Sequence, residues 1–136
     1  MKRVAIIVDK NLEMGAAANV TALLMGQLVM NNSNLYSDQP VIDQNNVQHA
    51  GIKYSTVILK GGKNQIANFS KSLSNNESSV KCVVFSETGQ TLNNEFDVYK
   101  EKITTSTLEE TKPVGVIVTG EDEEIRTLTK KFSVLK

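Results

Sequence analysis

Five polar side chains in this sequence have the chemistry that a binding or catalytic site needs. Asp9 comes directly after a short apolar run, and Glu87 and Thr88 come directly after another. Open α/β sheets bind their ligands beyond the carboxyl ends of their strands. Asn19 lies in a helical stretch that is otherwise apolar, and His49 closes a long polar segment. Asp9, Asn19, Glu87 and Thr88 are therefore predicted to bind a ligand, although each strand-end residue also fits a helix cap or a turn.

His49 is the only histidine and the candidate catalytic residue. An imidazole that reaches solvent titrates near neutral pH, as a general base requires. Asn19 or backbone amides would then stabilise an oxyanion. The alternative interpretations are an ordinary loop histidine and, for Asn19, a buried amide that is bonded to neighbouring backbone.

Other motifs give little support to metal or cofactor chemistry. With one His and one Cys, a metal site would need carboxylates, and no cluster of them has ligand spacing. The acidic run 121–124 is better explained as a helix start. Gly61-Gly62-Lys63 lacks the spacing of a Walker A loop and is predicted to be a plain turn. Cys82 is predicted to be a buried strand residue rather than a nucleophile, and no metal or cofactor is expected.

The length and composition fit one ordinary globular domain, predicted to span residues 1–136. Fifteen basic and fifteen acidic residues cancel, so the overall charge supplies no field that would attract nucleic acid. The single cysteine favours a reducing cytoplasm. No apolar span approaches the roughly 20 residues that cross a bilayer, so no membrane partner is expected.

Four apolar runs, at 4–8, 55–59, 80–85 and 114–118, are rich in Val and Ile with little polar alternation. That pattern is typical of strands covered on both faces. A helical pattern follows each run. The alternation predicts an α/β domain with a small, mostly parallel sheet of about four strands.

The predicted helices differ in how much of their surface is expected to be buried. The stretch 15–30 is apolar nearly all round, which predicts packing on the sheet and against another helix or a second subunit. Residues 31–48 are predicted to form a long polar connection with a short extended piece at 40–42. A capping box at Thr119 and Asp122 predicts the start of the last helix. Apolar spacing predicts the buried face of this last helix, Ile125-Leu128-Phe132, and the buried faces of two others, Ile66-Phe69-Leu73 and Leu92-Phe96-Tyr99-Ile103.

Several short motifs occur in a fixed order along the chain: Asn19-Val20-Thr21-Ala22, His49-Ala50-Gly51-Ile52, Phe85-Ser86-Glu87-Thr88-Gly89, Val114-Gly115-Val116 and Val134-Leu135-Lys136. With the opening strand, they resemble a bacterial family known as domain of unknown function two thousand, which is grouped by fold with peptidyl-tRNA hydrolase II. The resemblance implies a three-layer α/β/α sandwich with a small mixed sheet, commonly associating as a homodimer.

The sequence departs from peptidyl-tRNA hydrolase II in the first helix. That family resembles Leu12-Glu13-Met14-Gly15 but continues with a lysine, where this chain has Ala16-Ala17-Ala18. A lysine can hold phosphate or polarise an ester, and alanine can do neither. The preferred prediction is a cytoplasmic protein that binds a small molecule or partner at the strand-end rim. The alternatives are a hydrolase of peptidyl-tRNA or a related ester, with His49 as general base, and a non-catalytic dimeric interaction module.

Overall fold

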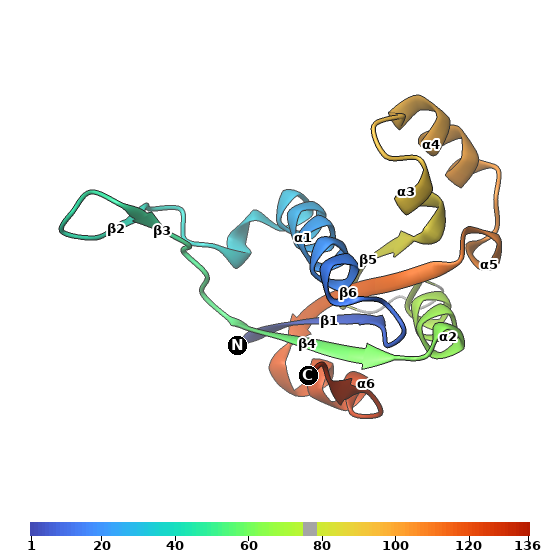
Figure 1. Cartoon of the computed structure of the whole chain (residues 1–136). Helices are drawn as coiled ribbons and strands as arrows, with labels where there is room; N and C mark the ends of the chain where they lie inside the picture. The colour runs from blue at the N-terminus through green and yellow to red at the C-terminus, as the bar shows by residue number, and fades with distance from the viewer. Residues whose placement is uncertain (75–78) are drawn as a thin grey trace.

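The computed structural model describes residues 1–74 and 79–136, which form six α-helices, a 3₁₀ turn (η1, Ser33–Leu35) and seven strands (Figure 1). The strands are β1 (Lys2–Asp9), β2 (Val41–Ile42), β3 (Gln48–His49), β4 (Ser55–Gly61), β5 (Lys81–Ser86), β6 (Pro113–Glu121) and β7 (Ser133–Val134). The helices are α1 (Met14–Asn31), α2 (Lys63–Ser74), α3 (Glu87–Thr91), α4 (Phe96–Thr104), α5 (Leu108–Thr111) and α6 (Asp122–Thr129).

Five of the strands form one mixed sheet in the order β5-β6-β1-β4-β7, and β2 and β3 pair separately. Only β1 and β4 are parallel neighbours, because β6 runs antiparallel to both β5 and β1, and β7 runs antiparallel to β4. The sheet is mixed and small, as the resemblance implies, with five strands where about four were predicted, but the prediction that it is mostly parallel was wrong. The four predicted apolar runs are strands, and three of them, β1, β4 and β5, do point the same way.

The direction of β6 follows from the connection that precedes it. The segment containing α3, α4 and α5 leaves β5 and returns to the same edge of the sheet, where the Glu87 N–H donates to the Lys112 carbonyl (2.8 Å). The chain has not crossed to the opposite edge, so the next strand must run back antiparallel. An unbroken apolar run indicates that a strand is buried on both faces, but it does not indicate in which direction the strand runs.

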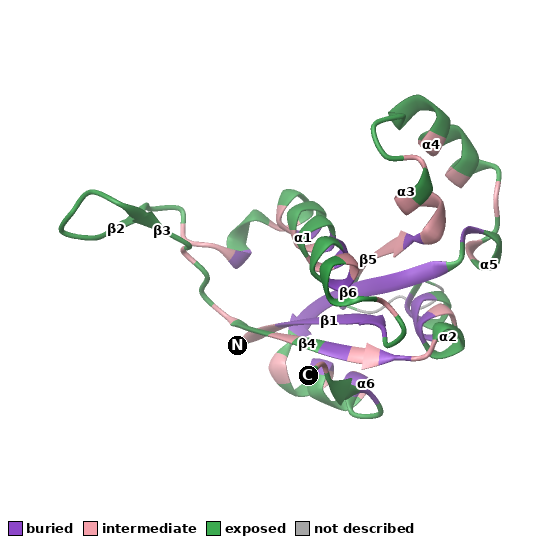
Figure 2. Cartoon of the chain, in the orientation of Figure 1, coloured by how far each residue is buried: buried purple, intermediate pink, exposed green. Residues whose placement is uncertain are grey.

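Helices lie against both faces of the sheet and bury two apolar clusters (Figures 1 and 2). On one face, α1 buries Val20, Leu24 and Leu28 against alternate residues of β1 and against β6. On the other, α2, α6 and Phe132 bury the intervening residues of β1. The predicted burial of α1 on more than one side is not seen within this chain, because one stripe of the helix is buried while Leu23 and Met30 are exposed.

Two later segments differ from their predicted helices. The predicted helical spacing from Leu92 to Ile103 holds only from Phe96, where α4 begins. Leu92 follows the end of α3 and opens a turn in which Asn94 has φ 67°, a left-handed conformation that Asn tolerates better than most residues. At the predicted capping box, the Thr119 hydroxyl donates to the Arg3 carbonyl (2.9 Å) on the neighbouring strand. It does not cap α6, whose N-cap residue is Glu121.

The long polar connection contains a hairpin that sequence analysis predicted only in part. The extended piece at 40–42 is β2, which pairs with β3 (Val41 with His49), and the hairpin projects away from the sheet (Figure 1). Every residue from 38 to 50 is exposed. Among the described residues, no helix combines the length and apolar character needed to span a membrane.

Candidate functional site

The width of α1 explains why open space remains on its face of the sheet. A helix is about 10–12 Å across and strands are about 4.8 Å apart, so one helix covers roughly two to three of the five strands. Helix α1 packs mainly over β5, β6 and β1. Beyond β5, the segment containing α3 and α4 rises beside α1, and a cavity of about 590 Å³ lies between them.

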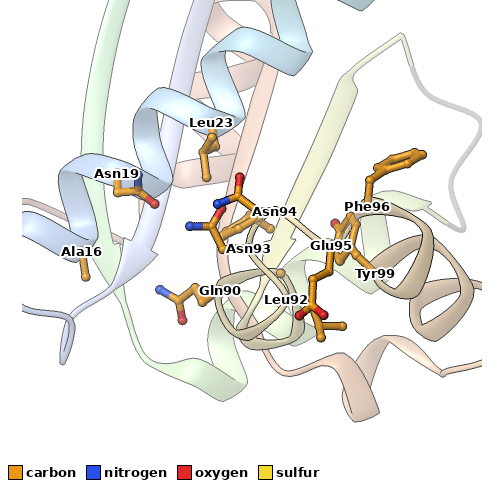
Figure 3. A pocket seen from close by; sticks show the side chains of 12 residues that line it. Ala16, Asn19, Leu23, Gln90, Leu92, Asn93, Asn94, Glu95, Phe96 and Tyr99 are labelled. Atoms are coloured by element: carbon orange, nitrogen blue, oxygen red, sulfur yellow. The ribbon is translucent and has the colours of Figure 1, made fainter.

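Most of the residues that line this cavity have apolar or amide side chains, and we call it the α1–α4 cavity (Figure 3). Asn19 and Leu23 of α1 lie opposite Gln90, Asn93 and Asn94. Its lining residues are Ala16, Asn19, Leu23, Phe85, Gly89, Gln90, Leu92, Asn93, Asn94, Glu95, Phe96 and Tyr99.

Two local features of the chain shape the wall opposite α1. Gly89 lets α3 lie directly against the ring of Phe85, because a Cβ at position 89 would come within 2.6 Å of that ring. The left-handed turn at Asn94 then reverses the chain between α3 and α4. This turn places two neighbouring amides, Asn93 and Asn94, in the cavity wall.

The electrostatic character of the α1–α4 cavity excludes a strongly anionic ligand. Glu95 is the only charged residue among its described lining residues, and none of them is Lys or Arg. A phosphate or carboxylate group would lose its hydration there without gaining a cationic partner. The wall instead offers amides, which donate and accept hydrogen bonds, beside the rings of Phe85 and Tyr99.

Of the five predicted site residues, only Asn19 lines the α1–α4 cavity. Asn19 is exposed on α1 and lines the α1–α4 cavity, so it is not a buried amide bonded to neighbouring backbone. Asp9 is buried at the end of β1 (2% exposed) and accepts a hydrogen bond from the Asn11 N–H (2.9 Å), a turn interaction. At the start of α3, Glu87 pairs with Lys63 Nζ (3.6 Å), and the Thr88 hydroxyl donates to a backbone carbonyl.

His49 lies in the projecting hairpin, on β3, and not beside Asn19 or Glu87 (Figure 1). Its Nε2 donates to the Asp43 carboxylate at 2.7 Å. That hydrogen bond, with those from the N–H groups of Val47 and Asn45, holds the pKa of Asp43 below its ordinary value. His49 also lines a separate groove of about 320 Å³ at the base of the hairpin.

We predict that His49→Ala raises the pKa of Asp43 toward its ordinary value, because the ring no longer bonds the ionised carboxylate. In the native chain these hydrogen bonds are present at neutral pH and are lost as pH falls through the depressed pKa. An NMR pH titration of the Asp43 carboxyl measures the midpoint in both proteins. An unchanged midpoint would show that the ring does not bond Asp43 in solution.

Cys82 does not have the environment of a reactive nucleophile. It lies half-buried on β5 against the apolar cluster beneath α2 and α6. Burial raises the pKa of the Cys82 thiol, so the thiol stays protonated at neutral pH. Within residues 1–74 and 79–136, no three His, Cys, Asp or Glu side chains gather in a group that could hold a metal ion.

Comparisons with known proteins place the chain in a family. A family model described as "Protein of unknown function (DUF2000)" matches residues 2–136. The chain belongs to the DUF2000 family. A solved structure, that of the protein of unknown function Atu0240 from Agrobacterium tumefaciens strain C58, has the same fold. It superposes with a TM-score of 0.83 at 15% identity, covering 99% of this chain and 98% of the other. No curated protein matches this chain.

Sequence reasoning missed most of the cavity of this DUF2000 protein. The helical spacing of Leu92 and Phe96 predicts one helix through Asn93 and Asn94, and no pattern in the sequence singles out Gln90. The available signal was the Asn93-Asn94 pair, since Asn favours turns and left-handed conformations. Leu23 belongs to the apolar stretch that predicts burial on more than one side of the helix, but it is 47% exposed on the cavity wall.

Proposed function

We propose that this protein binds a small neutral or cationic molecule in the α1–α4 cavity. The observation that carries the proposal is the concave wall that joins three aromatic rings to four amides and a single carboxylate. Its volume of about 590 Å³ is within the usual range of roughly 300–1,000 Å³ for small-molecule sites. The position, beside the carboxyl end of β5, is where α/β sheets bind ligands.

The chemistry of the lining narrows the ligand class. A flat ring would pack on Phe85 and Tyr99, and its polar edge would meet the amides of Asn19, Gln90 and Asn93. A cationic group would be stabilised by Glu95. Nucleosides and aromatic amines combine these features, whereas their phosphorylated or carboxylated counterparts add the negative charge that the wall does not accept.

We predict that Leu23→Arg abolishes binding in the α1–α4 cavity, because a long cation would fill the space between α1 and α3. The measurement is a thermal-shift screen with matched pairs, such as adenosine with its monophosphate and tyramine with 4-hydroxyphenylacetate. A ligand at 100 times its Kd stabilises by about 2.7 kcal/mol, a rise of several degrees in Tm. That rise should disappear in Leu23→Arg.

The matched control is Met30→Arg, which adds the same charge to the same helix at a residue that is 83% exposed and outside the cavity. This variant should keep the full shift in Tm. A shift retained in Leu23→Arg, or a preference for the anionic member of each pair, would contradict the proposal.

The remaining features of the proposal come from the sequence. We infer a single domain with the three-layer α/β/α arrangement of peptidyl-tRNA hydrolase II, acting as a homodimer in the cytoplasm. Ester hydrolysis with His49 as general base is the alternative. It would take place at the hairpin rather than in the α1–α4 cavity, because His49 bonds Asp43 there. Hydrolysis that is lost in His49→Ala, with ligand-induced shifts unchanged, would favour this alternative.

A further inference from the structure

A second groove lies on the other side of α1, where the helix leaves β4 uncovered. Val57 and Leu59 of β4 pack into the cluster beneath α2 and α6. The alternate residues Ile58 and Lys60 face the α1 side and stay partly exposed. A groove of about 510 Å³ lies there, bounded by the start of α1, β4 and Leu135, and we call it the β4 groove.

The β4 groove has an apolar floor. Leu12, Met14, Ile58 and Leu135 line it together with two alanines of α1. Met14 is 87% exposed although its side chain is fully apolar. Covering such side chains is favourable by about 25 cal/mol per Å² of apolar surface removed from water.

Among the described residues that line the β4 groove, all charged side chains are lysines: Lys10, Lys60 and Lys136. None of them takes part in the ion pairs that the structure gives for residues 1–74 and 79–136. Lys2, Lys63 and Lys71, by contrast, each pair with a glutamate. In a chain with no net charge, Lys10 and Lys60 therefore place two positive charges beside an apolar surface.

Two of these lysines are held close together by the sheet. Lys60 stands opposite Val8 in the parallel β1–β4 register. The backbone N–H of Lys10, two residues after Val8, donates to the Gly61 carbonyl at 2.9 Å. The side chains of Lys10 and Lys60 therefore extend from adjacent backbone positions at one end of the groove. A single anionic group there can bind both ammonium groups.

We propose that the β4 groove binds a small amphipathic anion, such as a medium-chain fatty acid. The carboxylate lies between Lys10 and Lys60, and the hydrocarbon chain covers Met14, Ile58 and Leu135. This site is separate from the α1–α4 cavity and has the opposite charge preference. A highly charged, purely polar anion fits less well, because it would leave the apolar floor exposed.

The test compares decanoate with decanol, which has the same chain and no charge. Isothermal titration calorimetry should give a Kd for decanoate at least about tenfold lower than for decanol. Amide NMR shifts caused by decanoate should map to the start of α1 and to β4, and not to α3 and α4.

Variants of the groove provide the second measurement. Met14→Glu places a negative charge on the floor at the first residue of α1, where an acidic residue suits the helix dipole and folding should be kept. It should weaken decanoate binding at least about tenfold, and Lys10→Gln with Lys60→Gln should do the same. The controls, Met30→Glu and Lys100→Gln with Lys130→Gln, change the same charges outside the groove and should leave the Kd unchanged.

Three results would overturn the proposal. The first is no binding of decanoate at millimolar concentration, and the second is equal binding of decanoate and decanol. The third is concentration-dependent self-association of the protein that Met14→Glu abolishes, which would assign the groove to a second copy of the chain. The changes in Tm caused by ligands of the α1–α4 cavity do not depend on any of these outcomes, so the two sites are tested separately.

Discussion

Gly115→Ala is expected to lower the free energy of unfolding by about 1–3 kcal/mol, the usual cost of overpacking a core. Gly115 lies in β6 directly beneath α1. A Cβ there would come within 2.6 Å of Val20 Cγ1 and 3.2 Å of Leu24 Cδ1, and 3.4 Å from the Ile7 carbonyl oxygen. The helix cannot move away without opening its contact with the sheet. Urea denaturation followed by circular dichroism measures the loss.

Two further variants make the Gly115 prediction specific. Gly26→Ala on the open face of α1, where an added Cβ meets nothing within 4 Å, should stabilise by about 0.5–1 kcal/mol. Val20→Ala removes the closest methyl group, so the double variant with Gly115→Ala should lose less than the sum of the two single losses. Additive losses, or a Gly115→Ala protein as stable as the native one, would contradict the close packing of α1 on β6.

Phe132→Ala is expected to cost about 3–5 kcal/mol and to lower the Tm by roughly 10 °C or more. Phe132 is 7% exposed, and its ring meets that of Phe69 edge-on, with centroids 5.3 Å apart and planes at 78°. It also fills the space beside Gly61, where an added Cβ would come within 2.7 Å of its ring. Its removal leaves a cavity between α2 and the end of β4.

Phe96→Ala is the matched control, because it removes the same ring from a residue that is 68% exposed. The free energy of unfolding should change by no more than about 0.5 kcal/mol. Differential scanning calorimetry of the two variants gives the comparison. Similar melting temperatures would show that the ring of Phe132 is not part of the core. Since Phe96 lines the α1–α4 cavity, its loss should instead weaken ligand binding there.

The positions of strands and long helices were predictable because burial leaves a local pattern in the sequence. The runs that became β1, β4, β5 and β6 could be recognised by their Val and Ile content, and α2 by the spacing of Ile66, Phe69 and Leu73. The break between α3 and α4 was missed because Leu92 and Phe96 keep helical spacing across it. The turn depends on the backbone of one residue, Asn94.

The candidate sites were predictable only where a residue type is unusual for its surroundings. Asn19 was selected as an amide in an apolar helix, and it lines the α1–α4 cavity. His49 was selected for its chemistry, but the hairpin that carries it pairs with itself and projects from the sheet. Leu23, Gln90 and Asn93 are ordinary residue types, and nothing in their local sequence indicates that they face one another.

The sequence by itself determined the four long strands and the helices α1, α2 and α6, because the burial of these segments leaves a pattern in neighbouring side chains. Only the tertiary structure decided the direction of β6, the open spaces on either side of α1 and the residues that line them. These features depend on how one helix fits over a wider sheet and on where the connections return. Both involve residues far apart in the chain, whose contacts leave no periodic signal in the sequence.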